Sequence, residues 1–101
     1  MEDITVQQLK DKLDAEEELK IIDVREPYEH EEFNIGGDLI PLNSLPGSLA
    51  SLESFKDKQV VIYCRSGQRS GMAQEFLAQA GFNQVRNLIG GMLHWQDTFG
   101  R

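Results

Sequence analysis

The single cysteine of the chain, Cys64, ends an apolar run and is followed at once by arginines, serines and a glycine. The heptapeptide that it opens follows Val60-Val61-Ile62-Tyr63 and reads Cys64-Arg65-Ser66-Gly67-Gln68-Arg69-Ser70. A strand that turns directly into a helix leaves several backbone N–H groups without intrahelical partners, aimed into the connecting loop. Because these groups and two guanidinium charges favour a thiolate, we expect the Cys64 thiol to titrate below the ~8.5 of free cysteine.

Two interpretations of Cys64 are open, a reactive nucleophile or a packing residue, because free cysteine is among the most buried residue types. A packing cysteine has no need for two arginines, a glycine and two serines within the next six positions, so we predict that Cys64 is the catalytic residue. A lone cysteine excludes an internal disulfide, a Cys-x-x-Cys pair and a multi-thiolate zinc site.

Composition limits both the size of the protein and its partners. The 101 residues, 40% of them hydrophobic, fit one globular domain over residues 1–101, with little room for a second. The net charge is −7 and the basic residues are scattered, so neither nucleic acid nor a membrane surface is an expected partner. Two arginines beside Cys64 still favour a small anion locally. A single thiol and no export signal predict a cytoplasmic protein.

Short apolar runs alternate with helical patterns along the chain. We predict strands over residues 19–25, 39–42, 60–64 and 85–89, and helices over 6–13, 27–33, 47–55, 71–80 and 92–99. This alternation is typical of an α/β fold, a parallel sheet with helices on both faces. Sites in such sheets form at the carboxyl ends of strands, where Cys64 lies and where Asp23-Val24-Arg25 ends another strand.

Three segments of the chain resemble the rhodanese family of sulfurtransferases. Ile21-Ile22-Asp23-Val24-Arg25-Glu26-Pro27-Tyr28-Glu29 is similar to the family's Asp-Val-Arg-Glu-Pro-x-Glu motif, the Cys64 heptapeptide to its active loop, and Gly90-Gly91-Met92-Leu93-His94-Trp95 to its Gly-Gly-x-x-x-Trp motif. They occur in the family's order. The segment 34–41 departs from the Gly-His-Ile-Pro-Gly-Ala of many members, and it shapes the rim of the site.

The resemblance implies a single rhodanese-like domain with a five-stranded parallel sheet, and a double-displacement reaction. The thiolate of Cys64 attacks the outer sulfur of a small anionic donor such as thiosulfate and becomes a persulfide, which an acceptor then discharges. No second cysteine can resolve the persulfide, so the acceptor must come from outside: cyanide, a thiol or a partner protein. We expect a monomer without cofactor or metal.

The other loop residues receive substrate-binding roles. Arg65 and Arg69 would neutralise an oxyanion donor and its leaving group, since the guanidinium fork matches oxyanions. The hydroxyls of Ser66 and Ser70 would donate hydrogen bonds. Gly67 permits close backbone approach. We expect Gln68 only to line the mouth.

Asp23 and Arg25 are expected to support the site rather than to react. They could form a buried ion pair or hydrogen-bond the active loop, although pairing of Arg25 with Glu29 is the plainer structural interpretation. His30 lies among glutamates, and we expect a solvated helix face there, because adjacent positions do not converge on one metal ion. His94 is expected on the surface or the rim of the site.

Two alternatives to a sulfurtransferase remain open. Cysteine phosphatases and arsenate reductases place five residues between Cys and Arg, whereas four separate Cys64 from Arg69 here. Tyr63 stands where such phosphatases commonly have His, and no nearby Asp is an obvious leaving-group acid. The second alternative is a binding or persulfide-carrier module without turnover, which persulfide formation on Cys64 would discriminate.

Overall fold

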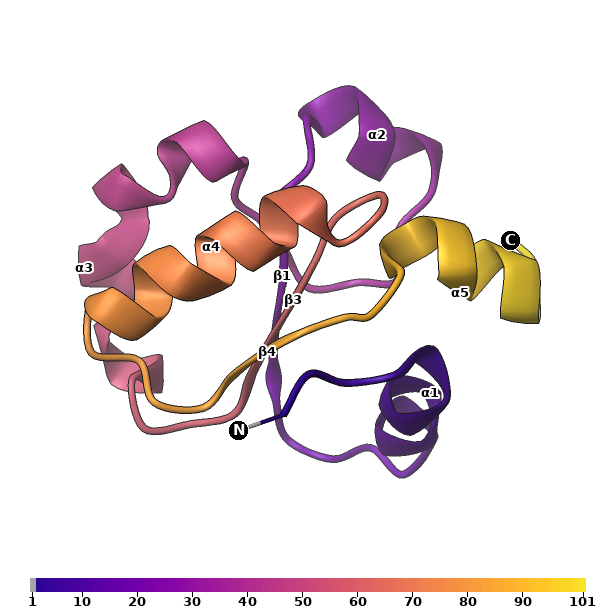
Figure 1. Cartoon of the computed structure of the whole chain (residues 1–101), viewed down its shortest axis with the longest axis horizontal. Helices are drawn as coiled ribbons and strands as arrows, with labels where there is room; N and C mark the ends of the chain where they lie inside the picture. Colours follow the sequence, from indigo (N-terminus) through magenta and orange to yellow (C-terminus); the bar gives the residue numbers. More distant parts are fainter. Residues whose placement is uncertain (1) are drawn as a thin grey trace.

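The computed structural model describes residues 2–101 and has four parallel strands at its centre with helices on both faces (Figure 1). The strands are β1 (Lys20–Asp23), β2 (Asp38–Leu39), β3 (Val60–Tyr63) and β4 (Val85–Asn87), in the order β2-β1-β3-β4. Asp23 pairs with Tyr63, so β1 and β3 end level with each other. Their carboxyl ends therefore form one edge, at which both predicted site segments meet.

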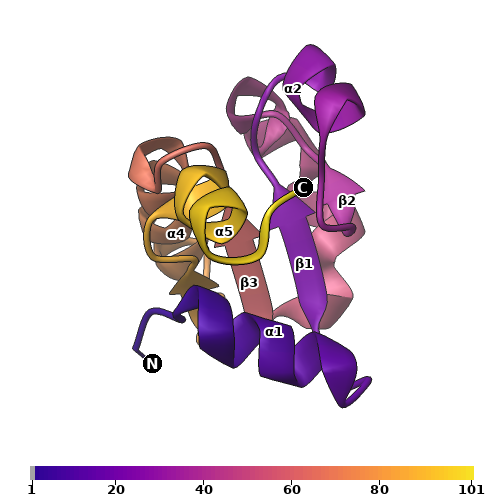
Figure 2. The ribbon, with the colours of Figure 1, turned by 90° about the vertical axis from the view of Figure 1, so that its right-hand side faces the viewer.

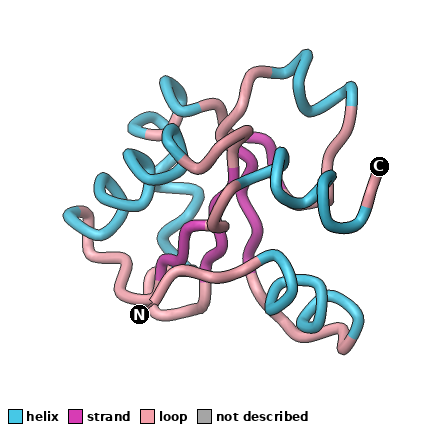
Figure 3. The backbone as a smooth tube through the Cα atoms, turned by 45° about the vertical axis from the view of Figure 1, so that its right-hand side comes forward, coloured by secondary structure: helices cyan, strands magenta, loops and turns pink. Residues whose placement is uncertain are grey.

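The helices are α1 (Val6–Asp14), α2 (Pro27–Glu32), α3 (Leu49–Leu52), α4 (Gln68–Gln79) and α5 (Gly91–Phe99). Figure 1 shows α1 and α5 on one face of the sheet and α3 and α4 on the other. In Figure 2, β1 and β3 run side by side toward the end of the molecule that carries α2. Loops connect the strand ends to the surrounding helices (Figure 3). None of the helices within residues 2–101 is long and apolar enough to cross a membrane.

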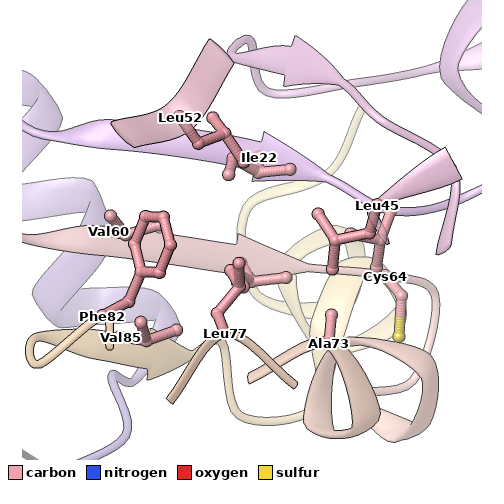
Figure 4. Packing of buried hydrophobic residues seen from close by; sticks show 11 residues of the cluster. Ile22, Leu45, Leu52, Val60, Cys64, Ala73, Leu77, Phe82 and Val85 are labelled. Carbon is pink, nitrogen blue, oxygen red and sulfur yellow. The ribbon is translucent and has the colours of Figure 1, made fainter. Parts of the chain in front are cut away.

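Alternation along the strands divides the hydrophobic core between the two faces. Ile21 and Val61 belong to the cluster beneath α1 and α5, whereas Val60 and Ile62 pack with residues of α3 and α4. Cys64 continues the alternation of Val60 and Ile62 and lies in their cluster, near α4 (Figure 4). The period of two along β3 therefore decides which side of the sheet receives the thiol.

The implied fifth strand is reduced to one bridge, a correction to the five-stranded sheet. Ile4 pairs with Leu88 in parallel and exchanges backbone hydrogen bonds with Asn87 and Ile89. Thr5 then caps α1, its hydroxyl accepting from the N–H of Gln8 while the Gln8 side chain accepts from the N–H of Thr5. This capping box, with Thr5 as the N-cap, begins the helix at Val6, so the chain leaves the sheet after one residue.

Some element boundaries differ from those predicted. The helix expected from Gly71 begins at Gln68, because Gly67 adopts a positive φ of 103° and so turns the chain straight from β3 into α4. The helix expected over 47–55 is a short α3 flanked by 3₁₀ turns at Leu42–Ser44, Pro46–Ser48 and Glu53–Phe55. The strand expected over 39–42 stops at Leu39, since Pro41 has no N–H for a ladder.

Candidate active site

The sulfur of Cys64 lies within a ring of hydrogen-bond donors between β3 and α4. It accepts from the backbone N–H of Gly67 at 3.1 Å, the N–H of Ser70 at 3.4 Å and the hydroxyl of Ser70 at 3.3 Å. These N–H groups belong to the first turn of α4, where no intrahelical acceptor exists for them. The Cys64 side chain has no exposed surface. The sulfur therefore lies in an enclosed pocket of donors.

The ionisation of Cys64 follows from two opposing effects. Burial raises the pKa of the Cys64 thiol, but hydrogen bonds from the Ser70 hydroxyl and from the N–H groups of Ser70, Gly67 and Ser66 lower it by more. The thiol pKa therefore lies below its ordinary value. The stabilisation comes mainly from uncharged donors rather than from the two loop arginines that the sequence had suggested.

The first residues of α5, which begins at the Gly90-Gly91 pair, orient this loop. The N–H groups of Met92 and Leu93 donate to the carbonyls of Cys64 and Arg65, at 2.9 and 3.0 Å. Because N–H and C=O point to opposite sides of a peptide plane, the Arg65 carbonyl turned toward α5 leaves the following N–H, that of Ser66, facing the sulfur. A Cβ on Gly91 would lie 2.5 Å from the Cys64 carbonyl oxygen, and its φ is +58°. Only glycine fits there.

Arg69 is bound by a carboxylate from another element. Its Nη1 and Nη2 donate to Oε1 and Oε2 of Glu29, in α2, at 2.7 and 2.9 Å. This pairing lowers the pKa of Glu29 to about 2, chiefly through the hydrogen bond from Arg69. The expected pairing of Glu29 with Arg25 is wrong, because the Arg69 guanidinium takes both carboxylate oxygens. The fork of Arg69 is thus already filled.

Asp23 and Arg25 form a buried ion pair at the end of β1. The Arg25 Nε and Nη2 donate to Asp23 at 2.9 and 2.8 Å, and Nη2 also donates to the Phe33 carbonyl at 2.7 Å. Burial raises the pKa of Asp23, but hydrogen bonds with Arg25 and His30 outweigh it and hold the pKa below its usual value. Of the two predicted arrangements, the structure has the ion pair.

His30 differs from its expected place on a solvated helix face. Its Nδ1 lies 2.8 Å from Oδ2 of Asp23, and its side chain is only 23% exposed. Pro27 begins α2 soon after β1 ends, so the first turn carries His30 back over the strand end. Among residues 2–101, no three His, Cys, Asp or Glu side chains are grouped closely enough to hold a metal ion. His94, by contrast, is exposed on α5, as expected.

A pocket of about 300 Å³ opens beside the loop, between α2 and α5. Three guanidinium groups and two carboxylates line it, together with apolar side chains; its lining includes Arg25, Tyr28, Glu29, Phe33, Arg65 and Arg101. Ser66 and Gln68 are exposed on the loop, and Gly67 and Arg69 are partly exposed. The structure thus brings the predicted loop to one edge of the sheet, and of its residues Arg65 lines this opening, whose size suits a small ligand.

Asn87 contacts the loop although its sequence position carried little signal. Its Nδ2 donates to the Gly67 carbonyl at 3.0 Å, and its Oδ1 lies 2.5 Å from the Ser70 hydroxyl. In the sequence it is one polar residue in a short predicted strand. Only the strand order, which places Asn87 opposite Ile62 in β3, brings it beside Cys64. A register between β3 and β4 would have been needed to find it.

Known proteins with similar sequences and structures agree with this geometry. The profile of the rhodanese-like domain matches residues 5–98. The putative sulfurtransferase YtwF of Bacillus subtilis is 39% identical over 97 residues, which are 95% of this chain and 91% of that protein. The putative sulfur carrier protein YrkF of the same organism is 36% identical over 94 residues, 92% of this chain, and the chain spans only 50% of its length.

A crystal structure of a rhodanese-like domain protein from Staphylococcus aureus superimposes with a TM-score of 0.84 at 33% identity, covering 94% of this chain and 91% of that one. The family match spans nearly the whole chain, including every residue of the loop and of the Asp23 cluster. The chain therefore belongs to the rhodanese-like domain family.

Proposed function

We propose that this protein is a sulfurtransferase that carries sulfane sulfur as a persulfide on Cys64. The carrying observation is the ring of uncharged donors from Gly67 and Ser70 around a buried sulfur. Such a ring stabilises an anion without a fixed counter-charge, so it can serve a thiolate and a persulfide in turn. Relatives named sulfurtransferase and sulfur carrier support rhodanese-type sulfur transfer.

In the first step, the Cys64 thiolate attacks the outer sulfur of a donor such as thiosulfate. The S–S bond of the donor breaks and sulfite leaves with the electron pair. Arg65, exposed on the loop and lining the pocket, would attract the anion. Because Cys64 has no exposed surface, a local movement has to uncover Sγ before the attack.

In the second step, an acceptor nucleophile attacks the terminal sulfur of the persulfide, and the bond to Sγ breaks with its electron pair returning to Cys64. With a single cysteine in the chain, this acceptor is external: cyanide, a small thiol or a partner protein. A reducing cytoplasm would supply thiols and keep Cys64 free. We propose that the reaction needs no cofactor and that each monomer carries a complete site.

The remaining residues then take different roles. The N–H groups of Ser66, Gly67 and Ser70 and the hydroxyl of Ser70 hold the charged sulfur. Gln68 is exposed at the start of α4 and would lie at the mouth of the site. Arg69 fastens the loop to α2 through Glu29. Asp23 and Arg25 hold the neighbouring strand end, and their support of the loop is indirect.

The size and charge of the loop distinguish this proposal from phosphoryl chemistry. Four residues separate Cys64 from Arg69, and the guanidinium of Arg69 is occupied by Glu29 rather than open to an oxyanion. We expect turnover of thiosulfate with cyanide and none of an aryl phosphate, measured in steady state on the same preparation. Substantial phosphatase turnover would refute the proposal.

A matched loop variant sharpens this test. Insertion of one glycine after Gly67 widens the ring and displaces the N–H groups from Sγ, so sulfur transfer should fall by at least tenfold, since misplaced donors lose most of their effect. Phosphatase activity should not appear, because no leaving-group acid is gained. Insertion of one glycine after Gly47, in an exposed turn with free space, is the control and should leave transfer unchanged.

A carrier without turnover is the second candidate, favoured by the relative named as a sulfur carrier. Persulfide formation distinguishes both candidates from a module that only binds, but both candidates form the persulfide, so it does not separate them from each other. Cyanide does separate them. A sulfurtransferase turns over many equivalents of thiosulfate with this small acceptor. A dedicated carrier releases sulfur only to its partner, so it consumes a single equivalent of thiosulfate.

A further inference from the structure

Asn87 reaches Cys64 through Ser70, and the chemistry of its amide fixes the direction of the contacts. The atom 3.0 Å from the Gly67 carbonyl has to be the amide nitrogen, because a carbonyl only accepts. The amide oxygen therefore faces the Ser70 hydroxyl, at 2.5 Å. The same hydroxyl lies 3.3 Å from the Cys64 sulfur.

The Ser70 hydroxyl thus has one proton for two acceptors. When Cys64 is a thiol, its S–H can donate to the Ser70 oxygen while the hydroxyl donates to Asn87. When Cys64 is a thiolate, the charged sulfur is the stronger acceptor and attracts the hydroxyl proton. Since Ser70 is fully buried, these two acceptors compete directly.

We propose that Asn87 is a positioning residue for sulfur transfer, which accepts the hydrogen bond of the Ser70 hydroxyl whenever the negative charge leaves the Cys64 sulfur. This inference rests on the proposed function. As Sγ bonds to the donor's outer sulfur and the donor's S–S bond breaks, the charge moves to the terminal sulfur of the persulfide, and the hydroxyl turns to Asn87. When the acceptor removes that sulfur, the electron pair returns to Sγ and the hydroxyl turns back. Only a rotation about the Cβ–Oγ bond is needed, and no proton is transferred.

Charged groups around the network act at longer range. Arg69 is paired with Glu29, Arg65 is exposed on the loop, and Asp3 accepts from the backbone N–H of Asn87 at 3.1 Å. In the part of the chain that the structure describes, Sγ accepts no hydrogen bond from either arginine. Competition between Sγ and Asn87 for the Ser70 hydroxyl should therefore dominate the response of the thiol.

The test is a double-mutant cycle on the thiol pKa, measured from the alkylation rate against pH. Ser70→Ala should raise the thiol pKa by about one unit, the value of a hydrogen bond to a charged group. Asn87→Ala should lower it by about half a unit, because the hydroxyl is released to the sulfur. In the Ser70→Ala background, Asn87→Ala should cause no further shift. Asn83→Ala, which removes an asparagine bonded to Asp57 away from the site, is the control.

Three outcomes of the cycle would overturn the proposal. A rise in thiol pKa in Asn87→Ala, or an equal shift with and without the Ser70 hydroxyl, would mean that Asn87 merely holds the loop through Gly67. An unchanged thiol pKa in Asn87→Ala would show that Asn87 is not coupled to the sulfur.

A second measurement does not depend on the folding of an Asn87 variant. In the unaltered protein below its thiol pKa, the S–H stretching band in the infrared should lie at lower frequency than that of a free thiol, because the thiol donates to Ser70. A band at the free-thiol frequency would contradict the network. Absence of a persulfide by mass would instead refute the proposed function, and these measurements would remain valid.

Discussion

The carboxyl ends of β1 and β3 lie side by side, but they stabilise negative charge differently, one with a counter-charge and the other with uncharged donors. At the end of β1, the guanidinium of Arg25 pairs with the carboxylate of Asp23, which also lies within hydrogen-bond distance of His30, and all three groups are partly or fully buried. At the end of β3, uncharged donors converge on the sulfur of Cys64. Matched charges hold a structure together, whereas donors without a counter-charge leave room for an anion that forms and disappears. We therefore propose that one edge of the sheet carries both a structural and a chemical centre.

The largest expected effect on stability is at the β1 end. Asp23→Ala leaves Arg25 buried without its counter-charge, so the free energy of unfolding should fall by about 3–5 kcal/mol in urea titration. The folded fraction should retain a thiol pKa close to that of the unaltered protein, since Asp23 has no hydrogen bond to the loop among the residues described.

The control for Asp23 is Asp38→Ala, which removes the carboxylate of the exposed ion pair with Lys20 and should cost less than about 1 kcal/mol. Equal losses of unfolding free energy in Asp23→Ala and Asp38→Ala would show that the buried ion pair stabilises the fold no more than an exposed one.

The next effect is at the support of the β3 end. Gly91→Ala forces a Cβ against the carbonyls of Cys64 and Arg65 at a positive φ, so we expect a loss of about 2–3 kcal/mol and at least a tenfold fall in sulfur transfer. Gly47→Ala, where a Cβ meets open space and φ is not positive, should leave both quantities nearly unchanged. Normal transfer by a Gly91→Ala protein would mean that the loop carbonyls need no such orientation.

A smaller effect separates uncharged donors from arginine at the β3 end. Arg69→Ala should raise the thiol pKa by less than Ser70→Ala does, because Glu29 already neutralises the guanidinium and Ser70 donates directly to the sulfur. Alkylation rate against pH on both variants measures the difference. A larger shift in Arg69→Ala would return the dominant role to charge.

The smallest effect is at low pH, at the contact that joins α2 to the loop. The pKa of Glu29 is about 2 in the folded protein, against 4.5 as its ordinary value. Because the pKa of Glu29 is lower in the folded protein, the ionised carboxylate stabilises the fold at pH values above its unfolded pKa of 4.5. This contribution disappears as the pH falls from about 4.5 toward 2. Glu29→Gln should therefore flatten the dependence of stability on pH in that window, followed by urea unfolding.

The exposed Glu31 of the same helix provides the control, and Glu31→Gln should keep the slope of the unaltered protein. An unchanged slope in Glu29→Gln would show that the Arg69 pair contributes no stability.

Local patterns in the sequence were enough to predict the fold class and the place of Cys64. The apolar run Val60 to Tyr63 and the helical pattern from Gly71 to Ala80 identify a strand followed by a helix, although the helix begins at Gln68, before the predicted start. The expected fifth strand is wrong. Thr5 caps α1 and so ends the strand pairing at Ile4, and this capping signal was not used to limit the strand in the prediction from sequence.

Partners from distant segments could not be predicted in the same way. Glu29 was assigned to Arg25 by helical spacing, but its carboxylate meets Arg69, forty residues away, because α2 lies across the loop. His30 was predicted on a solvated helix face, because the sequence does not show that α2 places it next to Asp23 at the end of β1. Asn87 required the order of β3 and β4. Each miss concerns a polar contact that only the assembled sheet creates.

The central claim is that the β3 end holds a sulfur anion on Cys64, and intact mass tests it most directly. After brief exposure to thiosulfate, the protein should gain the mass of one sulfur atom, and cyanide should then remove it. Cys64→Ser, a change of one atom that should leave the fold intact, should gain nothing and show no steady-state transfer. A folded protein that gains no sulfur, or a Cys64→Ser variant that still transfers it, would contradict the account.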